Sequence, residues 1–442
     1  MLQDLDPEDL KKMRSDFLEN DKYRNTQNAV MENGIKKSIT NKSVIESHPF
    51  VFSIDVDSDD VMNQKHSGRC WMFSAMNFIR HHVEKEHHMK NFELSTDYMF
   101  FYDKLERANY FYHNVIDTAD QPLSDRKVNW LMHTPQQDGG DWSLLVSLME
   151  KYGVVPASVM GETAVSANTT ELNFAFNRKL QKDAMKLRNL VNSDASDEKL
   201  ASELRRMNSE NYKILAISFG TPPEKFNFSY RDENNQYHTI GEVTPLEFFK
   251  KFVDINLNDY VELMNIPGLG YKYNQVYTIQ LSKNMVDGIE NRYLNVSMDE
   301  MNKLMLEQLK DGTPVWFGCD VLQEYNRPTG SLELGLYDWK RSFGFSLGKD
   351  KAERFEYGES LPTHAMLICG VELHDNKPIN WKIQNSWGNK VGHLGYFMMG
   401  EKWMNAYTYE IVINKKYLSD QQLSAYDKEP IELPYYNAFN PI

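Results

Sequence analysis

The chain has 442 residues, of which 41% are apolar and 12% aromatic, so it can bury a sizeable core. Its formal net charge of −14 argues against nucleic acid or an anionic membrane surface as a partner, because both attract lysine and arginine. No window approaches the roughly 18 consecutive apolar residues of a membrane span, and three cysteines do not make a disulfide framework.

Residues 1–50 are polar and are predicted to form a partly helical N-terminal arm. The first residues, MLQDLDPEDLKKM, have neither a basic start nor an apolar stretch, so no signal peptide is expected. Cysteines outside a disulfide framework suit a reducing compartment. We therefore expect a cytoplasmic protein.

The segment 51–162 is predicted to be the helical half of a core and to contain a candidate nucleophile. An apolar stripe recurs at helical spacing after Gly68: Met72, Met76, Ile79 and Val83. Cys70 then falls in the first turn of a helix, where unpaired N–H groups and the helix dipole favour a thiolate. The other two cysteines, Cys319 and Cys369, lie in apolar runs and are expected in the core.

The rest of the chain divides by pattern into three segments. Residues 163–310 are predicted to be mainly helical, because apolar residues recur there at a period of 3.6. Residues 311–418 contain short apolar runs broken by Gly, Asn and Pro, such as HAMLICGV, and predict an antiparallel sheet. Residues 419–442 form a tail. Helices followed by strands indicate an α+β fold.

A nucleophilic thiol needs a base, a group that orients the base, and donors for the oxyanion. His364 begins a predicted strand and is the candidate base. A turn at 375–376 predicts a long hairpin that brings Asn385 beside His364, so that the amide oxygen can fix the imidazole tautomer. Trp387 is expected to shield that hydrogen bond from water.

The oxyanion donors are expected near the nucleophile itself. Gln64 precedes Cys70 by a short loop, so its side-chain amide can lie beside the backbone N–H of Cys70. Together these two groups would hold the oxygen of a tetrahedral intermediate. The proposed reaction is acyl transfer, which needs neither a metal nor an organic cofactor.

The motifs QKHSGRCW, THAM and QNSWG resemble, in this order, the active-site signatures of papain-like cysteine peptidases. Papain-type enzymes place the histidine and asparagine roughly 130–150 residues after the cysteine. Here the interval is longer by about the length of segment 163–310. Further motifs, DKLERANYF, DGGDW, KYGVVP and PVWFGCDV, are similar to those of the bleomycin hydrolase and bacterial aminopeptidase C family.

This resemblance implies a papain-like core with a large helical insertion, an N-terminal hook, and a homohexamer whose active sites face an inner channel. It also implies that Gly139 and Gly140 let the backbone of a peptide substrate approach closely. Asp141 stands where relatives usually have glutamine, so we expect it to favour a basic group on the substrate.

The tail bears on whether the enzyme cleaves at the end of a peptide or within it. In the family it lies in the cleft, and its terminal carboxylate, here on Ile442, holds the free amino group of the substrate. The resemblance therefore implies an aminopeptidase. The ending YYNAFNPI departs from the usual small residues, so an endopeptidase on the same scaffold remains the alternative.

Two other classes of function compete with a peptidase. A binding protein on an inactive papain fold would have lost its nucleophile or base, whereas this chain keeps Gln64, Cys70, His364 and Asn385. Nucleic-acid binding as a second activity conflicts with the net charge of −14.

Overall fold

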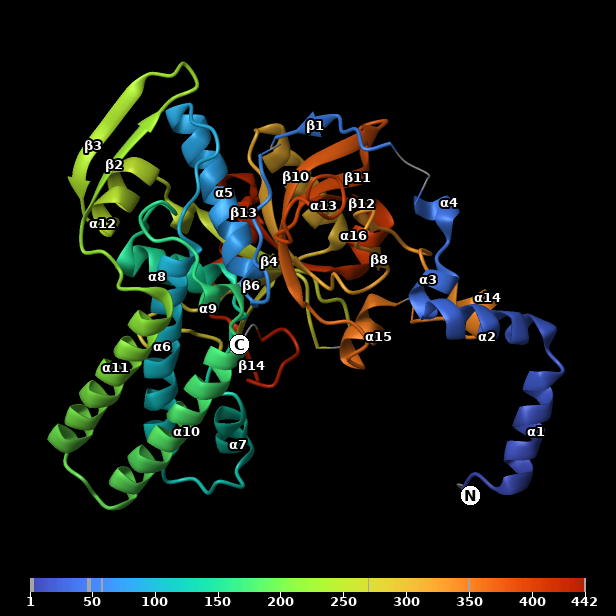
Figure 1. Cartoon of the computed structure of the whole chain (residues 1–442), viewed down its shortest axis with the longest axis horizontal. Helices are drawn as coiled ribbons and strands as arrows, with labels where there is room; N and C mark the ends of the chain where they lie inside the picture. Colours follow the sequence, from blue (N-terminus) through green and yellow to red (C-terminus); the bar gives the residue numbers. More distant parts are fainter. Residues whose placement is uncertain (1–3, 46–48, 57–58, 269, 349, 441–442) are drawn as a thin grey trace.

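Helices formed by the first part of the chain pack beside a large mixed sheet that comes mainly from the last part (Figure 1). The computed structural model describes residues 4–45, 49–56, 59–268, 270–348 and 350–440. The predicted α+β class is confirmed. None of the helices in the described ranges combines the length and apolar character needed to cross a membrane.

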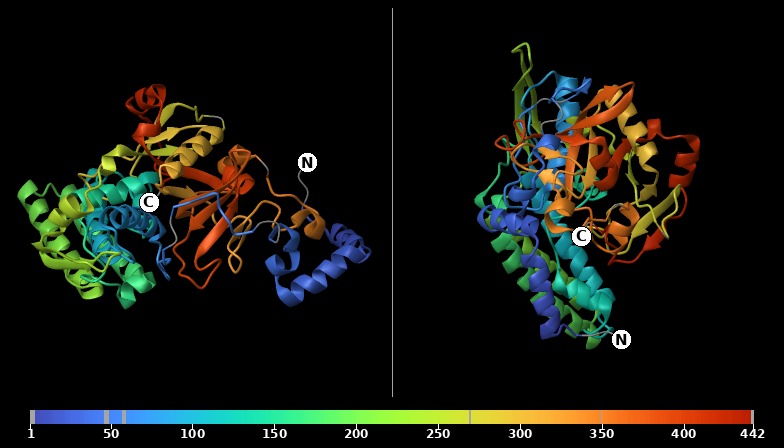
Figure 2. Two further views of the ribbon diagram at one scale, coloured as in Figure 1. Left: turned by 90° about the horizontal axis from the view of Figure 1, so that it is seen from above. Right: turned by 90° about the vertical axis from the view of Figure 1, so that its right-hand side faces the viewer.

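An arm of four helices extends away from the rest of the molecule (Figures 1 and 2). The helices are α1 (Pro7–Leu18), α2 (Asp21–Asn33), α3 (Ile35–Ile39) and α4 (Lys42–Ile45). The side chain of Asp6 caps α1 by accepting from the backbone N–H groups of Glu8 and Asp9. None of the residues in α1 and α2 is buried. The arm meets the body through Ile39, which packs against Leu336 and Tyr337.

Helix α5 (Cys70–His87) lies against the sheet and carries the predicted stripe. All four apolar residues of the stripe are buried, as are most of the other residues of this helix. The hydroxyl of Ser74 donates to the backbone oxygen of Ala365, and the Trp316 indole donates to that of Trp71. Both contacts fix the N-terminal end of α5 against two strands of the sheet.

The remaining helices of the helical layer are α6 (Thr96–Asp117), α7 (Arg126–His133), α8 (Trp142–Tyr152), α9 (Ala164–Ala167), α10 (Thr170–Asn192) and α11 (Asp197–Phe219). Helices α10 and α11 both pack along α6. The side chains of Ser196 and Asp125 cap α11 and α7. Helices α10 and α11 each bury one face and leave the other to solvent, whereas α6 is buried along most of its length.

The segment 163–310 also contributes strands that the sequence pattern did not predict. A hairpin of β2 (Phe226–Arg231) and β3 (Tyr237–Val243) is followed by α12 (Pro245–Phe248), a π-helical turn (Phe249–Val253) and a 3-10 turn (Leu257–Asp259). Next come β4 (Tyr260–Met264), β5 (Gln275–Ile279), β6 (Tyr293–Asn295) and α13 (Met298–Lys310). Strands β4–β6 extend the large sheet through β13. They are too short to show a clear period-2 pattern.

The large sheet has the strand order β14-β5-β6-β4-β13-β7-β10-β11-β12-β9-β8, and β1 pairs with β10. The bounds not yet given are β1 (Ile54–Asp55), β7 (Val315–Cys319), β8 (Tyr325–Asn326), β9 (Ser331–Leu332), β10 (His364–His374), β11 (Lys377–Gln384), β12 (Tyr396–Gly400), β13 (Thr408–Asn414) and β14 (Ile431–Leu433). Neighbouring strands are antiparallel, as predicted, in the run from β13 through β7, β10 and β11 to β12. Three pairs are parallel: β4 with β6, β5 with β14, and β9 with β12.

Two apolar cores flank this sheet. One lies between the sheet and the helical layer, and the other lies under α13 and α16 on the opposite face. The helices of the sheet half are α14 (Trp339–Phe343), α15 (Lys351–Glu356), α16 (Glu401–Tyr407) and α17 (Asp420–Tyr426), with a 3-10 turn at Lys415–Tyr417. The N-terminal end of α5 thus faces the middle strands β7 and β10.

The predicted hairpin of β10 and β11 is confirmed. Asp375 and Asn376 form its turn with φ values of 49° and 61°, the left-handed conformation that these residue types tolerate. The register pairs His374 with Lys377 and Leu367 with Gln384. Because the strands run back along each other, the start of β10 lies beside the residue that follows β11.

Candidate active site

Cys70 is the first residue of α5, and the preceding residue, Arg69, provides no side-chain cap. The first N–H groups of the helix therefore point toward the thiol without competition from a capping carboxylate or hydroxyl. Cys70 is partly exposed, whereas Cys319 and Cys369 are buried as predicted. Of the three cysteines, only Cys70 is accessible to a reagent or substrate.

His364 begins β10 and lies against Cys70. Burial by itself would raise the pKa of the Cys70 thiol, but the charge of His364 and hydrogen bonds from His364, Ala365 and Trp71 lower it below its ordinary value. Burial would likewise lower the pKa of His364, yet the thiolate and two hydrogen bonds raise it. The two shifts together favour a thiolate–imidazolium pair.

Asn385 fixes the imidazole of His364. The Nε2–H group donates to Asn385 Oδ1 at 2.9 Å, and this oxygen also accepts from the backbone N–H of Ser386 at 2.7 Å. With Nε2 engaged, Nδ1 is the ring nitrogen left for the hydrogen bond with Cys70. The ring of Trp387 lies 5.1 Å from that of His364, centroid to centroid, where it covers one side of the imidazole.

Replacing Asn385 with alanine is expected to raise the pH at which Cys70 becomes reactive. Loss of the hydrogen bond lowers the pKa of His364, so less imidazolium is present at a given pH to stabilise the thiolate. The measurement is the rate of iodoacetamide alkylation of the Cys70 peptide against pH, read by mass spectrometry. The native chain should react at a pH below the ordinary thiol pKa. Asn380→Ala, a buried asparagine on β11 that contacts Glu372, is the control; an equal midpoint in both variants contradicts the assignment.

Gln64 is held beside Cys70 by the loop that precedes α5. Its backbone N–H donates to Ser386 O at 2.8 Å, its Oε1 accepts from the Ser386 hydroxyl, and its Nε2 donates to Ser67 O at 2.7 Å. The amide has two hydrogens on Nε2, so one remains after the bond to Ser67. Gln64, Cys70 and His364 line the same cleft, which has a volume of about 570 Å³.

Gly139, Gly140 and Asp141 also line this cleft. A Cβ atom on Gly140 would lie 2.5 Å from the indole of Trp71, so a side chain is excluded here by the ring behind it. Asp141 is buried and caps α8 by accepting from Trp142 N at 2.8 Å. Its other oxygen accepts from the Tyr293 hydroxyl.

The tail enters the cleft after it leaves the sheet. Strand β14 pairs with β5 at the edge, and Phe439 and Asn440 then contribute to the cleft lining. The ring of Phe439 packs edge-on against Tyr293 at 5.0 Å, centroid to centroid. Ile442, which the sequence indicated as a substrate-binding residue, lies outside the described residues.

Sequence reasoning missed two buried charged groups that hold the loops of the cleft. Arg69 forms ion pairs with Asp97 and Glu162. Asp138 accepts from Gly68 N at 3.1 Å and from Lys104 Nζ at 2.6 Å, and its backbone oxygen accepts from the Trp71 indole at 2.8 Å. Asp138, the first residue of DGGDW, and Lys104, the lysine of DKLERANYF, were the sequence signals that could have predicted this buried ion pair.

Comparison with known proteins gives consistent matches over the whole chain. A model of the peptidase C1-like family matches residues 4–440. An aminopeptidase C of Streptococcus thermophilus is 44% identical over 420 residues, which is 95% of this chain and 94% of that protein. An aminopeptidase E of Lactobacillus helveticus is 38% identical over 439 residues, or 99% and 100%. The crystal structure of PepW from Lactobacillus rhamnosis has a TM-score of 0.97 at 45% identity and covers 99% of both chains.

Proposed function

The chain belongs to the peptidase C1-like family and is a cysteine peptidase, and we propose that it is an aminopeptidase with Cys70 as its nucleophile. The family expected from the sequence motifs is confirmed. The observation that carries the assignment of the nucleophile is the His364–Asn385 pair beside the accessible cysteine at the start of α5. A binding protein on an inactive papain fold would be expected to lack the cysteine or the histidine of this set.

The reaction follows from these groups. The Cys70 thiolate attacks the carbonyl carbon of the peptide bond, and the new oxyanion accepts hydrogen bonds from Gln64 Nε2 and the backbone N–H of Cys70. The imidazolium of His364 then gives its proton to the leaving amine. In the second half, neutral His364 takes a proton from water, and the resulting hydroxide displaces Cys70 from the acyl-enzyme. Throughout the reaction, the hydrogen bond from His364 Nε2–H to Asn385 Oδ1 keeps Nδ1 of the imidazole facing Cys70.

The substrate is a peptide whose backbone lies along Gly139 and Gly140. Both glycines line the cleft beside Cys70, and the lack of side chains leaves their backbone accessible to another extended chain. Trp387 covers one side of the His364 ring and limits the access of water to the hydrogen bond with Asn385. These contacts support a site that binds an extended peptide, not a small metabolite.

The tail supports the aminopeptidase over the endopeptidase. Phe439 and Asn440 occupy part of the cleft lining, so the chain itself restricts the length of substrate on that side. The relatives that match nearly the whole chain are named aminopeptidases C and E. In this proposal the terminal carboxylate of Ile442 receives the protonated amino group of the substrate.

Two broader features belong to the same proposal. We place the enzyme in the cytoplasm, because none of its three cysteines, all in the described part of the chain, forms a disulfide and one of them has to stay reduced for activity. We also propose a homohexamer in which the arm contacts neighbouring subunits. Leu10, Met13, Phe17 and Met31 are exposed on the arm, and burial of large apolar side chains such as these favours an interface between subunits.

A peptide digest read by mass spectrometry tests the mode of cleavage. A mixed-sequence peptide is offered with a free and with an acetylated N-terminus, and Cys70→Ala provides the blank. We expect stepwise loss of single N-terminal residues that acetylation prevents. Removal of residues 435–442, which leaves β14 intact, should admit the acetylated peptide. Internal cuts by the full chain in the acetylated peptide would instead identify an endopeptidase.

A further inference from the structure

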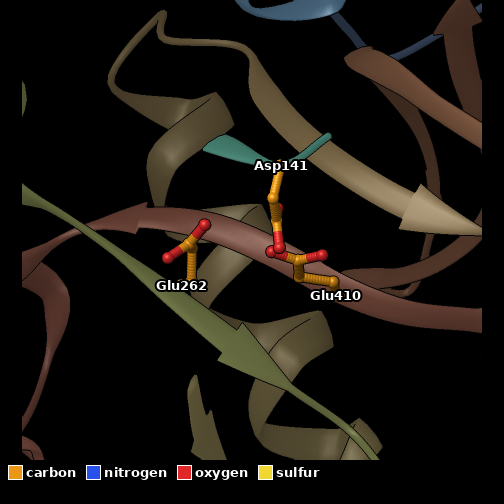
Figure 3. A group of neighbouring side chains, drawn as sticks. All are labelled: Asp141, Glu262 and Glu410. Carbon is orange, nitrogen blue, oxygen red and sulfur yellow. The ribbon is translucent and has the colours of Figure 1, made fainter. Parts of the chain in front are cut away.

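Three buried carboxylates from distant parts of the chain lie close together (Figure 3). Asp141 comes from the start of α8, Glu262 from β4 and Glu410 from β13. One oxygen of each lies within 4.8 Å of an oxygen of the other two. Their exposed fractions are 2%, 2% and 5%. Such a group of like charges is costly to bury unless protons or a cation neutralise it.

This acidic pocket opens into the cleft that contains Cys70 and His364. Asp141 and Glu410 both line that cleft. Gly318 lines it too and pairs with Glu410 across β7 and β13. A Cβ atom on Gly318 would lie 3.2 Å from Glu410 Oε2, so the absence of a side chain leaves the carboxylate accessible from the cleft.

The hydrogen bonds of the three groups single out Glu410. Asp141 accepts from Trp142 N and the Tyr293 hydroxyl, and Glu262 accepts from both the backbone N–H and the hydroxyl of Ser143. Within the described part of the chain, no N–H or hydroxyl group donates to the buried Glu410 Oε1, and the one side-chain hydrogen bond of Glu410 is the proton that it shares with Asp141. An unsatisfied buried oxygen of this kind costs free energy that a donor from a ligand would recover.

No basic side chain of the described residues neutralises the pocket. In the described part of the chain, no lysine or arginine nitrogen lies within 4.0 Å of an oxygen of these three carboxylates. The guanidinium of Arg292, which lines a separate cavity on the other side of Glu262, donates to the backbone oxygens of Tyr426 and Lys428. Burial, and then the charge of Asp141, raise the pKa values of Glu262 and Glu410 well above their ordinary range.

We propose that this pocket binds a protonated amine or guanidinium group of the peptide substrate, with Glu410 as its direct partner. The inference rests on the proposed peptidase function. The pocket faces the reacting cysteine through an open cleft, so its natural occupant is part of the bound peptide. A cation there would donate a charge-assisted hydrogen bond to Glu410 Oε1 and would replace the protons that neutralise the carboxylates.

The position of the tail indicates which part of the substrate is held. Phe439 packs on Tyr293, whose hydroxyl donates to Asp141, so the acidic pocket lies at the end of the cleft that the tail enters. In an aminopeptidase this is the side of the substrate's amino end. The cationic group is therefore a lysine or arginine side chain close to the amino end, or the α-ammonium itself, which the pocket would then share with the carboxylate of Ile442.

Calorimetric binding to the Cys70→Ala protein tests the proposal without relying on hydrolysis. Four otherwise identical tetrapeptides combine a free or acetylated N-terminus with lysine or norleucine at the first two positions. We expect a cationic group to strengthen binding roughly 10- to 100-fold. An advantage of lysine in acetylated peptides identifies the side chain. An advantage of the free amine in norleucine peptides assigns the α-ammonium to this pocket only if Glu410→Gln reduces it, because the carboxylate of Ile442 is proposed to bind the same group. No advantage in either pair would overturn the proposal.

The variant Glu410→Gln, added to Cys70→Ala, should reduce that advantage to less than about threefold, while the acetylated norleucine peptide, which has no cationic group near its amino end, binds as before. Glu84→Gln is the matched control, because Glu84 is also a buried carboxylate with a raised pKa but lies near the far end of α5. If Glu410→Gln does not fold, the same binding measurement is made on Asp141→Asn, because asparagine keeps the side-chain oxygen that caps α8. An unchanged advantage in the folded variant contradicts the proposal.

A metal ion is the competing occupant, and it is tested on the same proteins. Calorimetry with Ca²⁺, Mg²⁺ and Zn²⁺ should show no stoichiometric binding that depends on Glu410. One tightly bound divalent ion that is lost in Glu410→Gln would make the pocket a metal site and overturn the proposal. Because these measurements do not use catalysis, a failed peptide digest with intact binding would reject the proposed function, whereas binding of the cationic group that depends on Glu410 would still be established.

Discussion

Replacing Cys70 with alanine is expected to lower kcat/KM for peptide hydrolysis on the order of 10⁴- to 10⁶-fold, the scale on which removal of a covalent nucleophile acts. The residue lies at the N-terminal end of α5, hydrogen bonded to His364, and its thiol pKa is lowered there. His364→Ala should cost about as much, because without the imidazolium the thiolate loses its main stabilising charge. The two losses should not add, since the groups act as one unit.

The chain supplies its own control for this experiment. Cys369→Ala removes a buried cysteine from the same strand, β10, that begins with His364. That variant should keep the activity of the native chain within a few fold. Alkylation should likewise label Cys70 and spare the two buried cysteines. Full activity of Cys70→Ala, or inactivation by loss of Cys369 alone, would remove Cys70 from the mechanism.

Replacing Lys104 with methionine is expected to lower the free energy of unfolding by about 3–5 kcal/mol, because it leaves a buried charge on Asp138. The ammonium of Lys104 is fully buried, and it donates to Asp138 Oδ1 at 2.6 Å, to Gln137 O at 3.0 Å and to Asn173 Oδ1 at 2.9 Å. Its charge and hydrogen bonds hold the pKa of Asp138 well below its usual range, against the effect of burial. Urea denaturation measures the change.

The same substitution should also reduce catalysis. Asp138 holds Gly68 and Trp71 through hydrogen bonds, so a shift of its loop displaces both the start of α5 and Gly139. The double variant Lys104→Met/Asp138→Asn should recover part of the lost stability, because it removes the unpaired charge. Lys303→Met breaks an exposed ion pair with Glu300 and should cost less than about 1 kcal/mol. Equal losses for Lys104→Met and Lys303→Met would show that the buried pair has no special role.

The parts of the site that were predicted depend on local sequence. The apolar stripe after Gly68 predicts a helix that begins near Cys70, and α5 begins at that residue. The turn at Asp375 and Asn376 predicts the hairpin of β10 and β11, because both residue types tolerate the left-handed backbone. Once that hairpin forms, the contact between His364 and Asn385 follows from its register.

The parts that were not predicted depend on contacts between distant segments. Strands β4–β6 gave no clear periodic signal, and their place beside β13 is set by pairing across the sheet. Asp141 was identified as a possible binding residue, but Glu262 and Glu410 were not, since each lies in a strand whose neighbours the sequence does not state. The role of Asp138 in holding Gly68 and Trp71 was also hidden, because it needs three loops to meet.

The sequence by itself determined the chemistry available to this protein: a cysteine at a helix start, a histidine and an asparagine linked by a hairpin, and a glutamine in the preceding loop. Each of these follows from the backbone preferences of a few neighbouring residues. Only the tertiary structure decided which carboxylates gather near Cys70 and where the tail enters the cleft. The reason is that the register of a sheet, and not local propensity, sets which distant side chains share a pocket.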